Sequence, residues 1–239
     1  MKTRTIEYRQ GNTVLEGFLA YDTAGPARKP GILVIHEWMG PGPHVKNVAE
    51  QLARLGYIAF AADIYGVDVR PDNPKDAAAT AAIYRNNRGL LRERGKAGLQ
   101  ELLRQEGVDA ERIACIGYCF GGSAALELAC SGADIKGIVS FHGGLDAPSR
   151  QDCKNIRGKV LALHGADDPI APPEQVKVFE DDMRAGNVDW QLVKYANTVH
   201  AFTNPAAGND NSRGVAYNAD ADRRSWQAMK CFFKEIFQE

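Results

Sequence analysis

The sequence has no surplus of charge of either sign and no long apolar run. Its 239 residues carry 29 basic and 30 acidic side chains, for a formal net charge of -1. A chain so balanced lacks the basic surplus that holds a nucleic-acid backbone or an anionic membrane surface. No window approaches about 18 uninterrupted apolar residues, and residues 1–12 lack the apolar region of a secretory signal. We therefore expect no nucleic-acid partner, no membrane association and a cytoplasmic location.

Cysteine is sparse, and the histidines lack the spacing of metal ligands. The five cysteines form an odd set without a CxxC pair, which argues against a disulfide framework or a structural zinc site. The five histidines include neither an H-x-x-x-H nor an H-E-x-x-H pattern. We expect at least one free thiol, no bound metal and no other cofactor. The cysteines are Cys115, Cys119, Cys130, Cys153 and Cys231.

What the sequence does contain is an alternation of short apolar runs with segments of helical spacing. Strands are predicted at 3–9, 13–21, 31–36, 57–62, 112–117, 135–141, 160–164 and 190–195. Helices are predicted at 44–55, in two pieces within 74–105, and at 120–130, 173–185 and 213–237. Such alternation indicates right-handed crossovers between parallel strands. We expect an α/β-hydrolase fold, with a mostly parallel sheet, helices on both faces and an N-terminal antiparallel hairpin. Because no composition break marks a second domain, residues 1–239 are expected to form one domain.

The strongest local signal is the sequence Gly-Tyr-Cys-Phe-Gly-Gly at 117–122, between a predicted strand and a predicted helix. Glycines two residues to either side of Cys119 allow the strand and helix to approach closely, and the turn exposes the cysteine. The start of the helix favours a thiolate and an oxyanion, so the backbone N–H of Phe120 is a candidate oxyanion donor. Cys119 is therefore a candidate nucleophile. The alternative is that it is a small buried side chain in a tight turn.

A nucleophile of this kind needs a base and a carboxylate to orient that base, and both follow along the chain. Asp167 and Asp168 come directly after the predicted strand 160–164, and His200 lies in the loop after the strand 190–195. The order Cys, Asp, His is that of α/β-hydrolases. Singly, an aspartate before proline often only forms a turn, and a loop histidine is often only exposed. We favour His200 as the base and Asp168, over Asp167, as its orienting carboxylate.

The other histidines are weaker candidates for the base. His36 and His164 end predicted strands, where hydrogen bonding in the core or a loop is the more typical role. No partner is predicted for His44 or His142.

With these residues in place, the chain resembles the dienelactone hydrolase family, whose members are cysteine-dependent α/β-hydrolases. The resemblance covers nearly the whole chain and is carried most specifically by the motif around Cys119. It is supported by Ile-His-Glu-Trp-Met-Gly at 35–40, Asp-Ile-Tyr-Gly at 63–66, Gly-Ala-Asp-Asp-Pro at 165–169 and His-Ala-Phe at 200–202. The resemblance implies that Glu37 contacts the thiol and moves when substrate enters. It also implies that the backbone N–H of Trp38 is the second oxyanion donor. Without the family, Glu37 could equally be a solvated loop side chain.

The sequence departs from the family at positions that would bind a substrate carboxylate. Family members acting on dienelactone have an arginine four residues after the histidine, where this chain has Asn204, and a second near Thr80. Arg85 or Arg88 could replace this clamp, although long charged side chains usually cover a helix surface. We therefore expect a neutral, partly aromatic ester. The side chains expected near the substrate are Trp38, Tyr84, Phe202 and Asn204.

Together these features predict an enzyme that hydrolyses small carboxylic esters or lactones through a thioester on Cys119, as a monomer or small homo-oligomer. Two alternatives stay open. A site prepared for a tetrahedral oxyanion also suits a neutral phosphotriester, as a main or promiscuous activity. Alternatively, the fold could be catalytically idle and serve in binding or redox sensing through Cys119.

Overall fold

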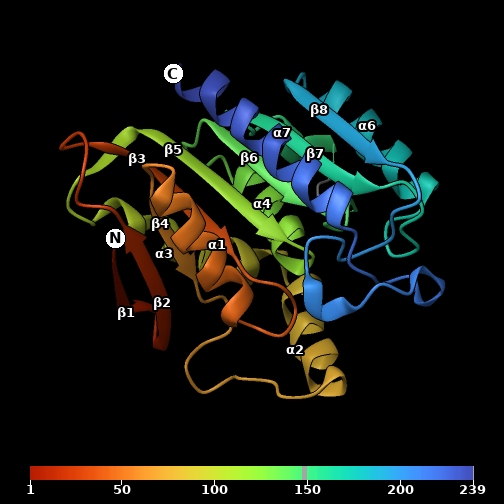
Figure 1. Ribbon diagram of the computed structural model, residues 1–239, viewed down its shortest axis with the longest axis horizontal. Helices are drawn as coiled ribbons and strands as arrows, with labels where there is room; N and C mark the ends of the chain where they lie inside the picture. Colours follow the sequence, from red (N-terminus) through yellow and green to blue (C-terminus); the bar gives the residue numbers. More distant parts are fainter. Residues whose placement is uncertain (147–149, 239) are drawn as a thin grey trace. The chain divides into compact units, whose positions relative to one another are not determined.

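The computed structural model describes residues 1–146 and 150–238, traced along the sequence in Figure 1. Contacts between residues divide the chain into two compact units, Met1–Ile116 and Gly117–Glu239. We refer to them as the first and the second unit. The expectation that the whole chain forms one domain stays a prediction.

The first unit opens with an antiparallel hairpin of β1 (Lys2–Gln10) and β2 (Thr13–Tyr21). The turn between them contains Gly11, whose φ of +55° favours glycine. β2 also pairs antiparallel with β4 (Ile58–Ala62), which in turn pairs parallel with β3 (Lys29–Ile35). Every residue of β3 and β4 is buried, as expected for apolar strands covered on both faces. The predicted N-terminal hairpin is confirmed.

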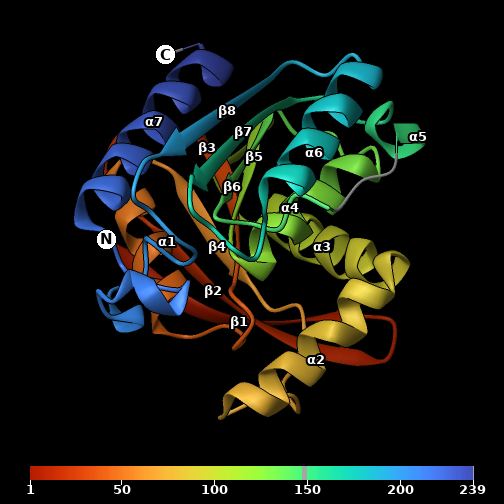
Figure 2. The same cartoon turned by 90° about the vertical axis from the view of Figure 1, so that its right-hand side faces the viewer.

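Helices cover both faces of the strands in the first unit (Figure 2). α1 (Pro43–Arg54) packs on β2, β3 and β4 from one side, and α3 (Arg88–Leu103) packs on β1, β3 and β4 from the other. α2 (Pro74–Asn86) packs on α3. The side chains of Asn73 and Asn87 cap α2 and α3 by accepting backbone N–H groups in their first turns. The two helical pieces predicted within 74–105 are therefore confirmed.

The strands of the second unit are parallel. β5 (Val108–Tyr118) passes from the first unit into the second, where β6 (Gly137–Phe141), β7 (Lys159–Gly165) and β8 (Trp190–Tyr195) follow. β6 pairs with β7, and β7 pairs with β8, in the same direction along the chain. Their carboxyl ends therefore lie at one edge, where the loops of an open parallel sheet carry functional residues.

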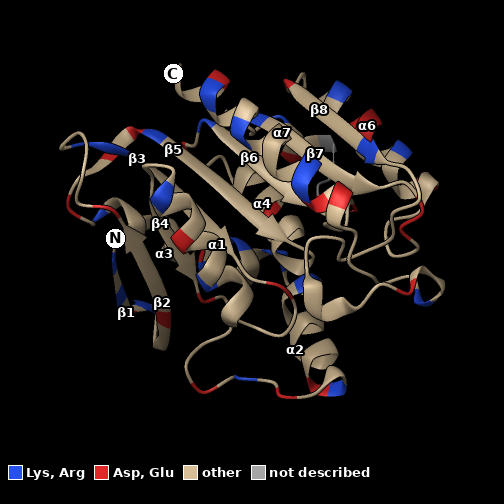
Figure 3. Cartoon of the chain, viewed as in Figure 1, with Lys and Arg blue, Asp and Glu red and all other residues tan. Residues whose placement is uncertain are grey.

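Helices α4 (Phe120–Cys130), α6 (Pro173–Ala185) and α7 (Ala219–Phe237) belong to the second unit, with the short α5 (Arg150–Cys153). Figure 2 shows α6 and α7 on opposite faces of β7 and β8. Acidic and basic residues are interspersed along α6 and α7, in keeping with the balanced charge of the chain (Figure 3). Among the described residues, no helix has the length and apolar character needed to cross a membrane.

Two predicted boundaries differ from the structure by four or more residues. α7 begins at Ala219, whereas the helix was predicted from residue 213. Gly214 adopts a left-handed conformation, and the side chain of Asn218 accepts the N–H groups of Asp220 and Ala221, so the helix starts there. β5 begins at Val108, earlier than predicted from the apolar run at 112–117; its first five residues are exposed or partly buried, so no apolar run marks them in the sequence. α5 was not predicted.

Candidate active site

Cys119 lies in a strained turn between β5 and α4. Its φ is +53° and its ψ is -117°, a conformation that non-glycine residues rarely adopt. A side chain at Gly117 would overlap the carbonyl group of Gly121, and one at Gly122 would meet the side chain of Ser140. The close approach of strand and helix that was predicted as the reason for Gly117 is therefore confirmed. Such a conformation costs about 1–3 kcal/mol and persists only where its surroundings fix it.

Hydrogen bonds hold this turn at both ends. The N–H of Cys119 donates to the carbonyl oxygen of Phe141 over 3.0 Å, and its own carbonyl oxygen accepts from the N–H of Gly122 over 3.0 Å. Phe120 is buried and is the first residue of α4, so its peptide group lies at the positive end of the helix. The Cys119 side chain is half-buried, and all five cysteines are free thiols, as expected for at least one of them.

The structure brings Asp168 and His200 together. Oδ2 of Asp168 lies 2.8 Å from Nδ1 of His200, and each residue is 3% exposed. Oδ1 of Asp168 accepts from the N–H groups of Ile170 and Ala171 over 2.8 and 3.3 Å. The carboxylate is thus fixed by the backbone on one side and orients the imidazole with the other. Asp167, the alternative from the sequence, is exposed.

Cys119 is close enough to His200 to affect its ionisation. Burial lowers the pKa of His200, but the hydrogen bond with Asp168 and the neighbouring Cys119 sulfur raise it to about 10. Nε2 of His200 is buried and forms no hydrogen bond of ordinary geometry within the described part of the chain. Since Nδ1 is bonded to Asp168, Nε2 is the nitrogen left to exchange a proton. A cationic imidazole beside a thiol favours the thiolate.

The loop that carries His200 is tied to the segment before α7. The N–H of His200 donates to the carbonyl oxygen of Gly214, and the N–H of Ala216 donates to the carbonyl oxygen of His200, over 3.2 and 3.0 Å. Ala201, directly after the histidine, has a φ of +58°. The base therefore lies in an irregular backbone that long-range contacts hold in place.

His142 and His44 both have partners that the sequence did not predict. Nε2 of His142 lies 2.8 Å from Oγ1 of Thr203, and Nδ1 of His44 lies 3.3 Å from a carboxylate oxygen of Glu37. His142 follows β6 and contacts a residue 61 positions away in the sequence. No local pattern marks such a pairing, which is why the sequence predicts no partner for either histidine.

In the first unit, hydrogen bonds fix the backbone of the segment that contains Glu37 and Trp38. The carbonyl oxygen of Glu37 lies 2.6 Å from Nδ1 of His36 and accepts from the N–H of Gly40 over 3.1 Å. The carbonyl oxygen of Trp38 accepts from the hydroxyl of Tyr65 over 2.9 Å. Both residues are half-buried. As predicted, His36 is a hydrogen-bonding core residue.

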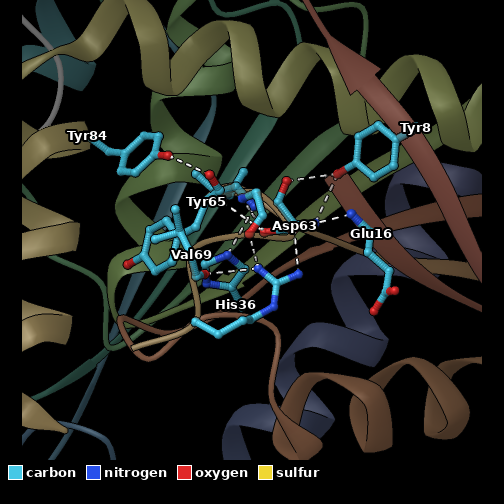
Figure 4. A network of polar contacts seen from close by, with 10 residues as sticks. Tyr8, Glu16, His36, Asp63, Tyr65, Val69 and Tyr84 are labelled. Atoms are coloured by element: carbon cyan, nitrogen blue, oxygen red, sulfur yellow. Dashed lines mark hydrogen bonds and ion pairs between the residues drawn. The ribbon is translucent and has the colours of Figure 1, made fainter. Parts of the chain in front are cut away.

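A buried network around Asp63 supports this segment and was missed from the sequence (Figure 4). Asp63 is fully buried, and its carboxylate accepts from the N–H groups of Glu16, Tyr65 and Gly66. It also forms an ion pair with Arg70 over 2.8 Å. Both carboxylate oxygens of Asp63 therefore have partners within the first unit, as a buried carboxylate requires.

Tyr8 and His36 extend the network. The hydroxyl of Tyr8 donates to the carbonyl oxygen of Asp63 over 2.9 Å and accepts from its N–H over 3.0 Å. Burial raises the pKa of Tyr8, which keeps this hydroxyl neutral and able to donate. Nε2 of His36 accepts from the N–H of Ile64 over 3.1 Å, so the proton of the ring is on Nδ1. This Nδ1–H donates to the carbonyl oxygen of Glu37.

The side chains predicted near the substrate lie in different surroundings. Tyr84 is buried in the Asp63 network, where it donates to the carbonyl oxygen of Tyr65 and stacks on its ring. Phe202 is 0% exposed and packs against His142 and Tyr195, so the structure places it in the core.

The remaining candidates for the substrate site are polar. Asn204 is half-buried and caps the turn 205–207 by accepting the N–H of Ala206. Arg85 is exposed on α2, and Arg88 is half-buried at the start of α3. Within the described residues, no group of three or more His, Cys, Asp or Glu side chains could hold a metal ion.

Known proteins place this chain in a family. A model of the dienelactone hydrolase family matches residues 15–237. The chain belongs to the dienelactone hydrolase family. The solved structure named m3DLH is 40% identical, with a TM-score of 0.94 and 98% of each chain covered. A dienelactone hydrolase-like promiscuous phosphotriesterase from metagenomic libraries is also 40% identical, with a TM-score of 0.93 and the same coverage.

A relative from Caenorhabditis elegans, protein K02A2.1, is 32% identical over 151 residues, which are 62% of this chain and 96% of that one. Membership of this family makes the protein a hydrolase with the α/β-hydrolase fold. The fold and the hydrolase activity expected from the sequence are both confirmed.

Proposed function

We propose that this dienelactone hydrolase family member cleaves carboxylic esters or lactones with Cys119 as nucleophile, His200 as base and Asp168 as the orienting carboxylate. The observation that carries the proposal is the buried Asp168–His200 pair, whose second ring nitrogen is left unbonded near the Cys119 sulfur. The positively charged imidazole of His200 lies near Cys119, a strained and half-buried residue at the start of a helix. This arrangement activates a thiol.

In the proposed acylation, transfer of the Cys119 proton to Nε2 of His200 gives the imidazolium–thiolate pair, and the thiolate attacks the carbonyl carbon. A C–S bond forms, and the electron pair of the carbonyl double bond moves to oxygen. The N–H groups of Phe120 and Trp38, the pair that the family resemblance implies, stabilise this oxyanion. When the intermediate collapses, the C–O bond to the leaving group breaks, and His200 returns the proton to the departing alkoxide. The product is an acyl thioester on Cys119.

In the proposed deacylation, His200 takes a proton from a water molecule, whose oxygen attacks the thioester carbonyl. The second tetrahedral intermediate collapses with cleavage of the C–S bond, which releases the carboxylic acid and regenerates the thiol. Throughout both steps Asp168 holds the imidazole in the tautomer that presents Nε2 to the reaction.

Glu37 is proposed as the gate of the thiol, a role taken from the family. Its carboxylate lies 3.3 Å from Nδ1 of His44, a contact within the first unit that the side chain would exchange when it moves. Glu37 is also proposed to help position water for deacylation. A burst of acyl-enzyme formation after Glu37→Ala is the expected result, and the absence of a burst would remove Glu37 from this step.

For the substrate, we propose a small neutral ester, because Asn204 stands where the family's carboxylate-binding arginine would be. The second candidate activity is hydrolysis of neutral phosphotriesters, whose P=O oxygen could occupy the same oxyanion site. It is favoured by the 40% identity to a structure described as a promiscuous phosphotriesterase. Purified enzyme that leaves an activated aryl phosphotriester intact would exclude this second activity.

The deciding experiment is steady-state hydrolysis of p-nitrophenyl acetate and butyrate, with intact-protein mass measured during turnover. We expect Cys119→Ala and His200→Ala to lower kcat by more than about 10³-fold and Asp168→Asn by about 10²- to 10⁴-fold. An acyl adduct should appear on the parent enzyme and be absent from Cys119→Ala. Full activity of Cys119→Ala would reject Cys119 as the nucleophile, and an inactive parent would support an idle fold with a binding or redox role.

A further inference from the structure

His142 lies against the proposed base on the end of β6. Its ring centroid is 5.3 Å from that of His200, and the two rings meet edge to face at 69°. Its Nε2 is 2.8 Å from Oγ1 of Thr203, a residue in the same loop as His200. All three residues are at least 95% buried. One side chain thus contacts both the imidazole of the base and the loop that carries it.

The backbone around this contact is strained at several points. His142 has a φ of +39°, and positive φ values also occur at Cys119 and Ala201. The N–H of His142 donates to the carbonyl oxygen of Leu163 over 2.8 Å, which fixes this conformation to β7. A bulky residue in the left-handed region is uncommon, costs about 1–3 kcal/mol and is retained where the surroundings require one side-chain direction. Here the required direction is toward His200 and Thr203.

We infer that His142 is a positioning residue for the base: its hydrogen bond to Thr203 and its ring contact hold the imidazole of His200 in the orientation that serves Cys119. This inference rests on the proposed function, because it assigns His200 the role of base. Asp168 fixes only Nδ1, and rotation about that hydrogen bond would move Nε2 away from the thiol. The ring of His142 occupies the space beside the imidazole and limits that rotation. The bond to Thr203 prevents the loop from moving as a whole.

The two contacts can be separated by substitutions of similar volume. Thr203→Val removes the hydroxyl, and His142→Phe keeps a ring but removes the hydrogen-bonding nitrogen. Thr203→Ser keeps the hydroxyl, whereas His142→Gln keeps a polar end group that can reach the hydroxyl of Thr203 but removes the ring beside His200. Misplacement of a reacting group by about 1 Å costs up to about 10²-fold in rate. We expect Thr203→Val, His142→Phe and His142→Gln each to lower kcat about tenfold with KM nearly unchanged, and Thr203→Ser to retain most of kcat.

The double variant tests whether the two residues act as one unit. If they act through their shared hydrogen bond, Thr203→Val combined with His142→Phe should lower kcat by the same factor of about ten relative to the parent enzyme as each single variant does. Independent effects would instead multiply to a loss of about 100-fold. Multiplicative effects, or a loss carried by KM with kcat unchanged, would overturn the inference. So would full kcat in both Thr203→Val and His142→Phe.

Ser225→Ala is the matched control, because this buried hydroxyl of the second unit donates to the carbonyl oxygen of Asp222 within α7. Thermal unfolding is measured for every variant, and we expect Ser225→Ala to lose stability with kcat unchanged. The inference and the proposed function fail separately in this experiment. Activity in Cys119→Ala or His200→Ala would reject the proposed function, whereas their inactivity beside a fully active Thr203→Val would reject only the role of His142.

Discussion

At the residue scale, buried histidines of this chain have opposite shifts in pKa, and the difference lies in the charge of their partners. Burial lowers the pKa of His36 to about 4, because its two nitrogens face neutral backbone groups. Burial also disfavours the charged form of His200, but Asp168 and the Cys119 sulfur more than offset it. The first histidine is suited to structure, and the second to exchanging protons.

His36 gives a prediction for stability against pH. The unfolded chain binds a proton at this residue below its ordinary pKa of about 6.5, whereas the folded protein does so only near 4. Stability is therefore full above about pH 6.5 and falls as the pH decreases from there to about 4, by up to about 3 kcal/mol. Urea unfolding of the parent and of His36→Gln at pH 7, 6, 5 and 4.5 measures this. The variant should start lower and depend less on pH, and parallel curves would contradict the assignment.

At the scale of the elements, β5 and α4 approach each other closely at the turn that contains Cys119. Gly117→Ala would place a methyl group on the carbonyl of Gly121, and neither backbone segment can move without breaking the turn of Cys119. We expect a loss of more than about 4 kcal/mol in the free energy of unfolding, or failure to fold. Gly89→Ala is the control, since a Cβ there meets only ordinary contact in the first turn of α3. Comparable stability of the two variants in urea would contradict the close approach.

Between elements, the Asp63 carboxylate links β2, the loop after β4 and Arg70. Asp63→Asn removes the charge and leaves buried N–H donors with a poorer acceptor, so we expect a loss of about 2–4 kcal/mol in urea unfolding. Asp220→Asn serves as the control, because Asp220 pairs with Arg223 on the exposed surface of α7. That substitution should leave the unfolding midpoint nearly unchanged. Equal losses from both substitutions would show that burial of the Asp63 pair contributes nothing.

At the scale of the whole molecule, the near-zero net charge predicts an enzyme whose encounter with substrate is insensitive to salt. With 29 basic and 30 acidic residues, no long-range field steers a neutral ester toward the protein. We expect kcat/KM for p-nitrophenyl butyrate to change less than about twofold between 50 and 500 mM NaCl. A steep decrease with salt would instead indicate a charged substrate-binding surface and would argue against a neutral ester.

Several elements were determined by the sequence alone, because their signals are local. The helices at 120–130 and 173–185 and the strands at 13–21 and 190–195 coincide with the structure at both ends. Each has a regular apolar period and a glycine, proline or polar turn beside it. The start of α7 was placed too early, because Gly214 and the cap at Asn218 outweigh the helical period of the residues between them.

The candidate triad was predictable for the same reason. Cys119 sits in a motif whose glycines are demanded by the turn itself, and Asp168 and His200 follow predicted strands. The Asp63 network and the contact of His142 with Thr203 were decided only by the tertiary structure. Their partners lie 55 and 61 residues apart in the chain, and no spacing in the sequence encodes such a distance. Folding brings them together because burial makes each polar group require a partner, and that requirement appears only once the strands have packed.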